Sequence, residues 1–212
     1  KPQAAMPQVF FLKDNFAVES VGITSTGNNY LTAPNLVLFN SKTNTVNEQA
    51  QFVPEMTGGS VSNVKIIKSG GNLSAGDGKL LAVDNTNGVG IISATYSEPT
   101  VTLRLKTPSP LGFGSMSFPF SVGDQVFVEN LGVTTGNGYN SIDYNYQYFT
   151  LTGVTTNPGQ VNQALISYDV PSAPGVHDNG NYGTVANKKD IAQFDLTLIE
   201  SVFVNNEIIY SG

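Results

Sequence analysis

Two serines and one histidine are the natural candidates for hydrolytic chemistry in this chain. Ser60 lies in Gly-Ser-Val-Ser-Asn and Ser115 in Gly-Ser-Met-Ser-Phe, and neither completes the G-x-S-x-G turn that exposes a nucleophilic serine. His177 is the one histidine, and no recognisable motif surrounds it, so we expect a solvated loop residue. The sequence has no cysteine, which excludes disulfides, thiolate metal ligands and cysteine nucleophiles. These residues do not point to nucleophilic hydrolysis.

Metal and phosphate sites are equally poorly supported. Asp84-Asn-Thr-Asn-Gly88 resembles the start of an EF-hand loop, but it is a residue short and lacks the distal glutamate, so we interpret it as a turn. Gly112-Phe-Gly-Ser and Gly136-Asn-Gly-Tyr lack the Lys-Ser/Thr or helix start that a phosphate-binding loop needs. We therefore expect no metal and no cofactor.

Four carboxylates are available for glycoside cleavage, namely Glu98, Asp124, Glu129 and Asp143. Glycosidases use two carboxylates about 5–9.5 Å apart, which come from distant strands and leave no local spacing to recognise. A polysaccharide depolymerase therefore remains a third hypothesis.

The tyrosine-rich run Asp143-Tyr-Asn-Tyr-Gln-Tyr-Phe149 is the one feature that suggests binding. In a strand, Tyr144, Tyr146 and Tyr148 would project to one face, where three rings could form a platform. Tyr139 lies in the glycine-rich loop just before them. We predict a protein-binding or glycan-binding surface at these four tyrosines, and we favour protein contact or packing over sugar.

Strands and turns must position these residues, because helical periodicity is scarce. The chain has 22 glycines and 11 prolines in 212 residues, with 40% hydrophobic and only 12% charged residues. Short Val, Ile, Thr and Phe runs alternate with turn signals such as Gly58-Gly59, Asn87-Gly88 and Asn137-Gly138. The sequence predicts an all-β fold of serial small antiparallel domains, of sandwich or barrel type, with little or no helix.

An internal repeat lies in the first ninety residues. Val18-Glu-Ser-Val-Gly-Ile…Gly27…Tyr30 matches Val61-Ser-Asn-Val-Lys-Ile…Gly70…Leu73, 43 positions later. In both copies the second valine and the isoleucine share a strand face, and the glycine permits the positive φ of a following turn. A repeat of this length indicates architecture rather than chemistry.

The repeat and a shift in composition suggest three segments. We predict a β-repeat domain over 1–92, a β-barrel or sandwich domain over 93–190, and a linking strand over 191–212 that could open a further domain. Thr100–Leu105 alternates as a half-buried strand does. The start at a lysine and the strand-like last residues suggest that the chain was cut from a longer polypeptide.

Charge argues against two classes of partner. The net charge is −6 and the basic residues are scattered, whereas nucleic acid binding needs a clustered positive surface. No run approaches the ~20 apolar residues that cross a bilayer, and the first residues do not resemble a signal peptide. We expect no nucleic acid and no membrane insertion.

Several segments resemble virion structural proteins of marine T4-like phages that infect cyanobacteria. They are Asn87–Ile91, Phe120–Asn130, Gly138–Phe149 and Thr152–Val154. Val18–Pro34 is similar to the V-x-x-V-x-I…G-x-x-Y-x-x-x-P module of many phage tail and fibre proteins. The resemblance implies a multi-domain virion protein built from serial β-domains, with no catalytic residue to carry over.

We therefore expect a non-catalytic structural component of a phage virion, in the tail, baseplate or fibre. It would be assembled in the host cytoplasm and would contact other virion proteins and copies of itself. The alternative is a host-surface adhesin whose tyrosines or Gly136–Tyr139 loop bind glycan rings. The depolymerase is the third hypothesis.

Overall fold

The computed structural model describes residues 9–43, 45–97, 99–106, 118–131, 145–156, 163–170 and 183–204. In these residues the chain is all-β, which confirms the predicted fold class. The elements are β1 (Val9–Thr26), β2 (Asn35–Asn40), β3 (Thr45–Val46), β4 (Ala50–Thr57), β5 (Ser60–Ser69), β6 (Gly78–Val83), β7 (Val89–Ser97), β8 (Thr100–Lys106), β9 (Gln125–Glu129), β10 (Tyr148–Thr156), β11 (Gln163–Asp169), β12 (Thr184–Asn187), the 3₁₀ turn η2 (Lys188–Asp190) and β13 (Ala192–Val204). No helix in the described ranges has the length and hydropathy to cross a membrane.

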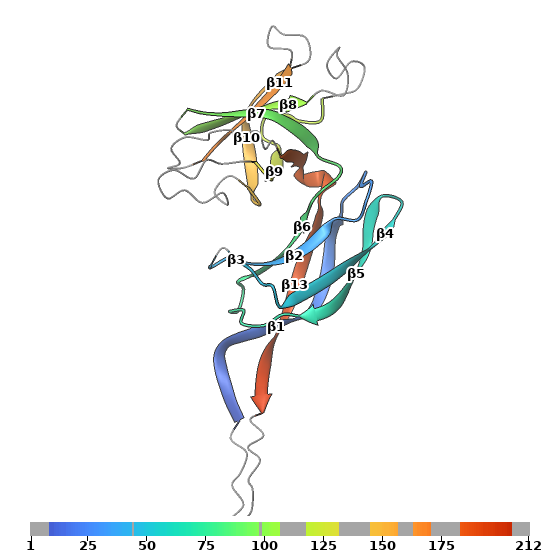
Figure 1. The fold of residues 1–212 in the computed structure, drawn as a ribbon, viewed down its shortest axis with the longest axis vertical. Coiled ribbons are helices and arrows are strands. Elements are labelled where there is room, and N and C mark those ends of the chain that lie inside the picture. The colour runs from blue at the N-terminus through green and yellow to red at the C-terminus, as the bar shows by residue number, and fades with distance from the viewer. Residues whose placement is uncertain are drawn as a thin grey trace, which may run out of the picture.

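Six of the strands form a closed barrel, in the order β10-β11-β8-β7-β12-β9 (Figure 1). Its interior follows from the sequence alternation, since Val101, Leu103 and Leu105 on β8 are fully buried while the residues between them are half-buried. Phe149 stacks on Tyr168 inside, with ring centroids 4.3 Å apart. Closure leaves the barrel without a free strand edge.

The remaining strands form a sandwich of three small antiparallel sheets, β1-β13, β3-β2-β6 and β4-β5. They enclose a second core, whose buried members are Val18, Leu38, Phe52, Leu73 and Leu80. In Figure 1 the sandwich lies below the barrel, and β1 and β13 run side by side at its lower end.

The strand β13 joins the two ends of the described chain. It pairs with β1 from Thr26↔Ala192 to Val9↔Val204. The first and last described strands thus belong to one sandwich, and the barrel strands come between them in sequence. The boundary expected after residue 92 falls inside β7. Local pattern predicted the strand, but its partner lies far away in sequence.

The two copies of the internal repeat take the same local structure. Val18 and Val61 are both buried at the start of their copies. The glycines at the turn, Gly27 and Gly70, have φ of 61° and 71°. Asn29 and Asn72, also 43 positions apart, both adopt positive φ, at 58° and 57°. The turn glycine therefore has the conformation that the sequence predicted.

Candidate functional site at the junction of the barrel and the sandwich

The tyrosine run does not form the continuous strand that its alternation predicts. Tyr139 and Tyr144 lie outside the described residues. Tyr146 sits in a bend with φ of 59°, and β10 begins only at Tyr148. The predicted strand geometry is therefore wrong at Tyr146. The cause is Asn145, whose buried side chain accepts from the Leu131 N–H at 2.8 Å and donates to the Leu131 carbonyl at 2.9 Å.

Tyr146 and Tyr148 nevertheless pack on one side, because both contact the ring of Phe127. The ring centroids lie 6.4 Å apart for Tyr146 and 5.3 Å apart for Tyr148. Lys188 Nζ lies 4.9 Å from the Tyr148 ring centroid, in a cation-π contact. The Tyr146 hydroxyl donates to Asn130 Oδ1 at 2.7 Å. These rings already have packing partners within the chain.

Phe127 faces the sandwich because β9 is buried on both sides. Val126 and Val128 point into the barrel core, whereas Phe127 belongs to a separate cluster that joins the two units. The buried members of this junction cluster are Tyr30, Val61, Ala82, Phe127, Ala186, Ile191 and Ala192. A strand buried on both faces reads as a continuous apolar run, as Val126-Phe-Val128 does.

Tyr30 ties the junction cluster together through its hydroxyl, which accepts a hydrogen bond from the Ala192 N–H at 2.8 Å. Burial raises the pKa of Tyr30 to about 12, so the ring stays neutral. Gly27 must be a glycine here, because a Cβ atom would lie 2.7 Å from both Ala192 N and Tyr30 Cε2.

The carboxylate of Glu129 is the chemically most distinctive group of the junction. It is only 2% exposed, and both of its oxygens accept hydrogen bonds from Asn85. Oε2 accepts from the Asn85 N–H at 3.0 Å and Oε1 from Asn85 Nδ2 at 2.5 Å. Burial raises the pKa of Glu129 to about 6 against the effect of these bonds, and the negative charge of Asp84 adds to the rise.

The predicted turn at residues 84–88 is observed, and it serves the junction. Asn85 Nδ2 also donates to the Ala82 carbonyl at 2.8 Å. Asn87 Nδ2 donates to the carbonyls of Asn28 at 2.7 Å and Asp190 at 2.6 Å. Thr86 Oγ1 accepts from the Leu31 N–H at 2.9 Å. The sequence signalled the turn, but nothing local signalled its long-range partners.

The other candidate residues fall in different places. Asp124 Oδ2 accepts from the Ser121 N–H at 2.9 Å and from Asn187 Nδ2 at 2.8 Å, so it orders the turn before β9. Ser60 begins β5 directly after the Gly58-Gly59 turn. Glu98, Ser115, Asp143 and His177 lie outside the described residues. Within the described residues, no group of three or more His, Cys, Asp or Glu side chains could hold a metal ion.

An open groove of about 1080 Å³ runs between the barrel and one side of the sandwich. The barrel contributes Tyr146, Gln147 and Tyr148, and the sandwich contributes residues of β6 and β13 that include Phe194 and Asp195. Asp195 is the single carboxylate among the described lining residues. The described lining residues thus combine aromatic and amide groups, and they do not include the carboxylate pair that glycoside cleavage requires.

Comparison with known proteins gives no relative for this arrangement: no family model, no curated protein and no solved structure matches the chain.

Proposed function

We propose that the protein is a non-catalytic structural component of a phage virion, in the tail, baseplate or fibre, and that it acts through contacts with other virion proteins and copies of itself. The observation that supports this proposal is that the side chains best suited to binding or catalysis are engaged in contacts within the chain. Glu129, Tyr146 and Tyr148 pack or hydrogen bond between the barrel and the sandwich. A stiff pair of β-units suits a protein whose task is to hold a position in a particle.

The surface supports the same proposal. Only 12% of the residues are charged, so contacts made by this surface should depend little on salt. Large apolar side chains are exposed at several separate places, among them Leu31, Val122 and Ile67 at 84%, 63% and 54%. Scattered apolar and hydroxyl groups fit broad contacts that become stable by repetition in a symmetric particle. The assignment to a virion rests on the resemblance of segments within residues 87–154 to phage virion proteins.

Gold labelling of purified particles tests the proposal. An antibody against the folded chain should label particles of the phage that encodes it at one fixed position, and mild disruption should release the protein with its neighbours. Protein that stays in the lysate and is absent from washed particles would contradict the proposal. An antibody against a cytoplasmic phage protein serves as the matched negative control.

A glycan-binding adhesin is the second candidate, favoured by the groove that Tyr146, Gln147 and Tyr148 line. Aromatic rings beside amide groups are the usual means of holding a sugar. Against it, Tyr148 already contacts Phe127 and Lys188. Saturable binding to a glycan array that is lost in Tyr146→Ala, with unchanged circular dichroism, would favour the adhesin. Binding that survives Tyr146→Ala, or no binding at all, would remove it.

A further inference from the structure

The sandwich repeats itself beyond the segment in which the sequence shows a repeat. We propose that it consists of two copies of one three-stranded unit, and that the barrel is an insertion into the connection that leads from the second unit back to the first. The first unit comprises β13, β1 and β2, and the second comprises β4, β5 and β6. This organisation does not depend on the virion role proposed above.

In the order β13-β1-β2 and β4-β5-β6, the second strands, β1 and β5, contain the repeat that is visible in the sequence. Their turn glycines approach corresponding neighbours. A Cβ on Gly27 would first meet Ala192 at the start of β13, and a Cβ on Gly70 would first meet Ala50 at the start of β4, at 2.7 Å and 3.0 Å. The same turn thus lies against the same position of a partner strand in each unit.

The last strands, β2 and β6, also lie 43 positions apart, residue for residue. They pair with each other antiparallel and without stagger, Asn35 opposite Val83 and Asn40 opposite Gly78. Two equivalent strands paired end to end in this way are related by a local two-fold axis, as in the isologous interface of a symmetric dimer. The sandwich is therefore organised as a pseudo-dimer within one chain.

The first strands, β4 and β13, are far apart in sequence but equivalent in the fold. Both begin with Ala-Gln-Phe, at residues 50–52 and 192–194. Phe52 lies opposite Ile66 and Phe194 lies opposite Ile23, and these two isoleucines are themselves repeat partners. Ala50 and Ala192 likewise lie opposite Ser69 and Thr26, again 43 positions apart.

The two irregularities of the β4-β5 ladder coincide with two of the β1-β13 ladder, whose third register shift, between Phe11 and Phe16, lies beyond the segment that matches β5. In β4-β5 the register shifts between Gln51 and Phe52 and again between Glu55 and Met56. In β1-β13 it shifts between the pairs Ser25↔Gln193 and Ile23↔Phe194, and again between Ser20↔Thr197 and Val18↔Leu198. These are corresponding steps. Because bulges are specific features of a strand pair, their agreement at two places is strong support for equivalence.

The equivalence locates the barrel as an insertion. β2 of the first unit is joined to β4 of the second by the short connection 41–49, whereas β6 of the second unit is joined to β13 of the first by residues 84–191, which contain the barrel. Both connections leave and enter equivalent strands. The ends of the longer one lie together, since Asn87 Nδ2 donates to the Asp190 carbonyl at 2.6 Å. A loop closed at its base tolerates a long insertion, because the entropy cost grows only slowly with length.

The sandwich is accordingly the repeated frame, and the barrel is the part inserted into it. The contacts that fix the barrel, Phe127 against Tyr30 and Glu129 with Asn85, are then additions that the other unit lacks. Consistently, the counterpart of Tyr30 is Leu73, a buried residue without a hydroxyl.

A strand transplant in the full chain tests the equivalence of β4 and β13. Because residues 192–194 already match 50–52, four substitutions, D195V/L196P/T197E/L198M, write the β4 sequence into β13. Proline at 196 should be accepted, since Pro54 occupies the equivalent ladder position opposite Val64. The matched control D195P/L196V/T197E/L198M has the same composition with the proline one residue out of register.

The expected result is that the in-register variant keeps the circular dichroism spectrum of the wild type and melts about 10 °C above the control. Equal changes in the two variants, whether small or complete, would overturn the equivalence.

A second experiment tests the insertion and does not rely on the transplant. A ten-residue Gly-Ser peptide placed between Lys42 and Thr43 occupies the connection that corresponds to the barrel, and the same peptide between Asn72 and Leu73 is the control. The first insertion should leave the melting temperature unchanged within about 3 °C, while the control should lower it clearly, because Leu73 is buried and its N–H and carbonyl both bond to Phe16. Loss of folding in the first insertion would overturn the proposal.

Discussion

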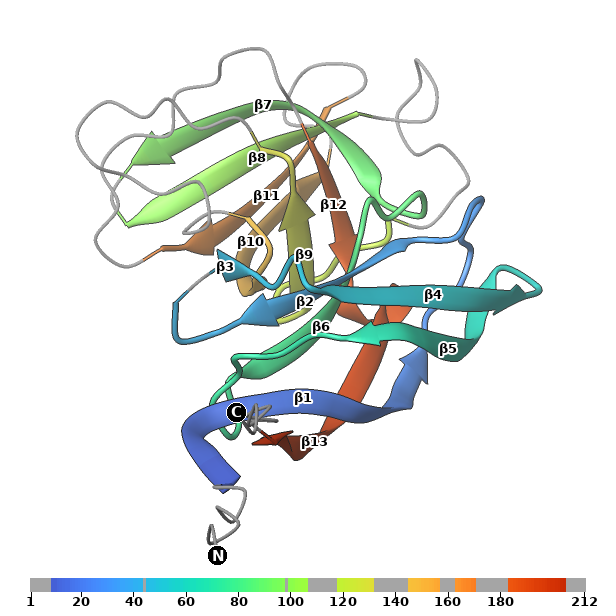
Figure 2. The same cartoon turned by 60° about the horizontal axis from the view of Figure 1, so that its bottom comes forward.

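The barrel and the sandwich are both antiparallel, but different interactions close them. In the barrel the hydrogen-bond ladder runs through all six strands and returns to its start. In the sandwich the ladder is interrupted into three sheets (Figure 2). Side chains from β1, β2, β4 and β6 fill the space between them. The barrel therefore combines a continuous ladder with a large buried core. The sandwich, whose ladder is interrupted, depends on a few large buried side chains and on its turns.

Removal of a core leucine should have the largest effect on either unit. Leu103→Ala in the barrel and Leu38→Ala in the sandwich each leave a cavity at a site that is 0% and 1% exposed, so each should lower the free energy of unfolding by about 2–5 kcal/mol. Urea unfolding measures the loss. Val122→Ala, at a 63% exposed side chain, is the control and should change little. A barrel or sandwich variant as stable as this control would contradict the assigned cores.

Alanine at the turn glycines Gly27 and Gly70 should lower the free energy of unfolding by a smaller amount, and by different amounts at the two positions. Gly27→Ala and Gly70→Ala both place a side chain at positive φ, which costs about 1–2 kcal/mol. At Gly27 the new methyl group also meets the Ala192 backbone and the Tyr30 ring, so Gly27→Ala should be at least about 1 kcal/mol less stable than Gly70→Ala. Thermal unfolding under identical conditions would show the difference, and the reverse order would contradict the packing described for Tyr30.

The junction should give the protein a pH dependence of definite sign. The folded-state pKa of Glu129 is raised from 4.5 to about 6, so the unfolded chain loses this proton first. Its contribution therefore favours folding below pH 4.5 and is lost as pH rises through 6, a change of about 2 kcal/mol. Because other groups titrate too, the quantity to measure is wild type minus Glu129→Gln at pH 4.5, 6 and 7.5. A difference that does not change with pH would contradict the burial of this carboxylate.

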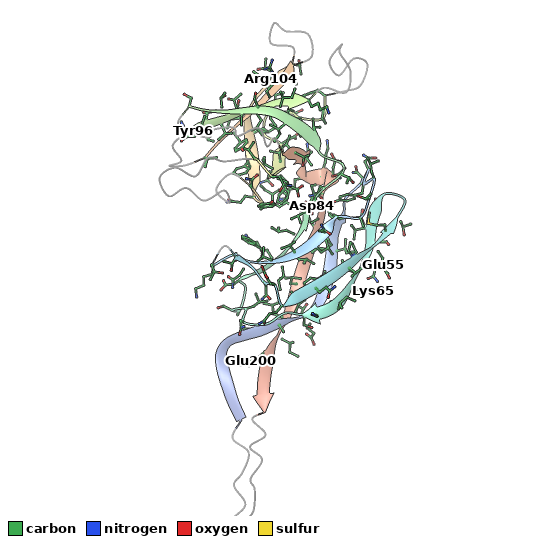
Figure 3. The ribbon with its side chains drawn as sticks, in the orientation of Figure 1. Glu55, Lys65, Asp84, Tyr96, Arg104 and Glu200 are labelled. Atoms are coloured by element: carbon green, nitrogen blue, oxygen red, sulfur yellow. The ribbon has the colours of Figure 1, made fainter. Side chains whose placement is uncertain are left out.

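The smallest effect should come from the exposed ion pair on the β4-β5 ribbon. Glu55 and Lys65 lie on the solvent side of the ribbon, away from both cores (Figure 3). Lys65 holds the pKa of Glu55 below its usual value, but water screens the pair. Lys65→Ala should leave the urea midpoint unchanged, with Lys65→Arg as the control that keeps the pair. A clear drop in the alanine variant alone would show that the ribbon surface contributes more than described.

The sequence predicted what depends on neighbouring residues. The alternation of Thr100–Leu105 indicated β8, and the glycines of the repeat indicated turns at Gly27 and Gly70, because periodicity and φ preference are local properties. The partner of β13 is set by a contact between opposite ends of the chain, and no local pattern encodes it. The bend at Tyr146 could not be predicted either, because Asn145 is held by Leu131, fourteen residues away in sequence.

The candidate site was predicted only in part. The sequence singled out the tyrosine run, and Tyr146 and Tyr148 pack against the same cluster. The sequence offered Glu129 as one of four available carboxylates and Asn85 as a turn residue, without a reason to pair them. Their pairing follows from the position of β9, which is buried on both sides between barrel and sandwich.

Glu129 holds the barrel on the sandwich through Asn85, and a double-mutant cycle measures this interaction. Urea unfolding of the wild type, Glu129→Ala, Asn85→Ala and the double variant gives the interaction energy of the pair. We expect a coupling of about 1 kcal/mol or more, because each single variant leaves a buried polar partner unsatisfied. Strict additivity of the two substitutions would contradict it.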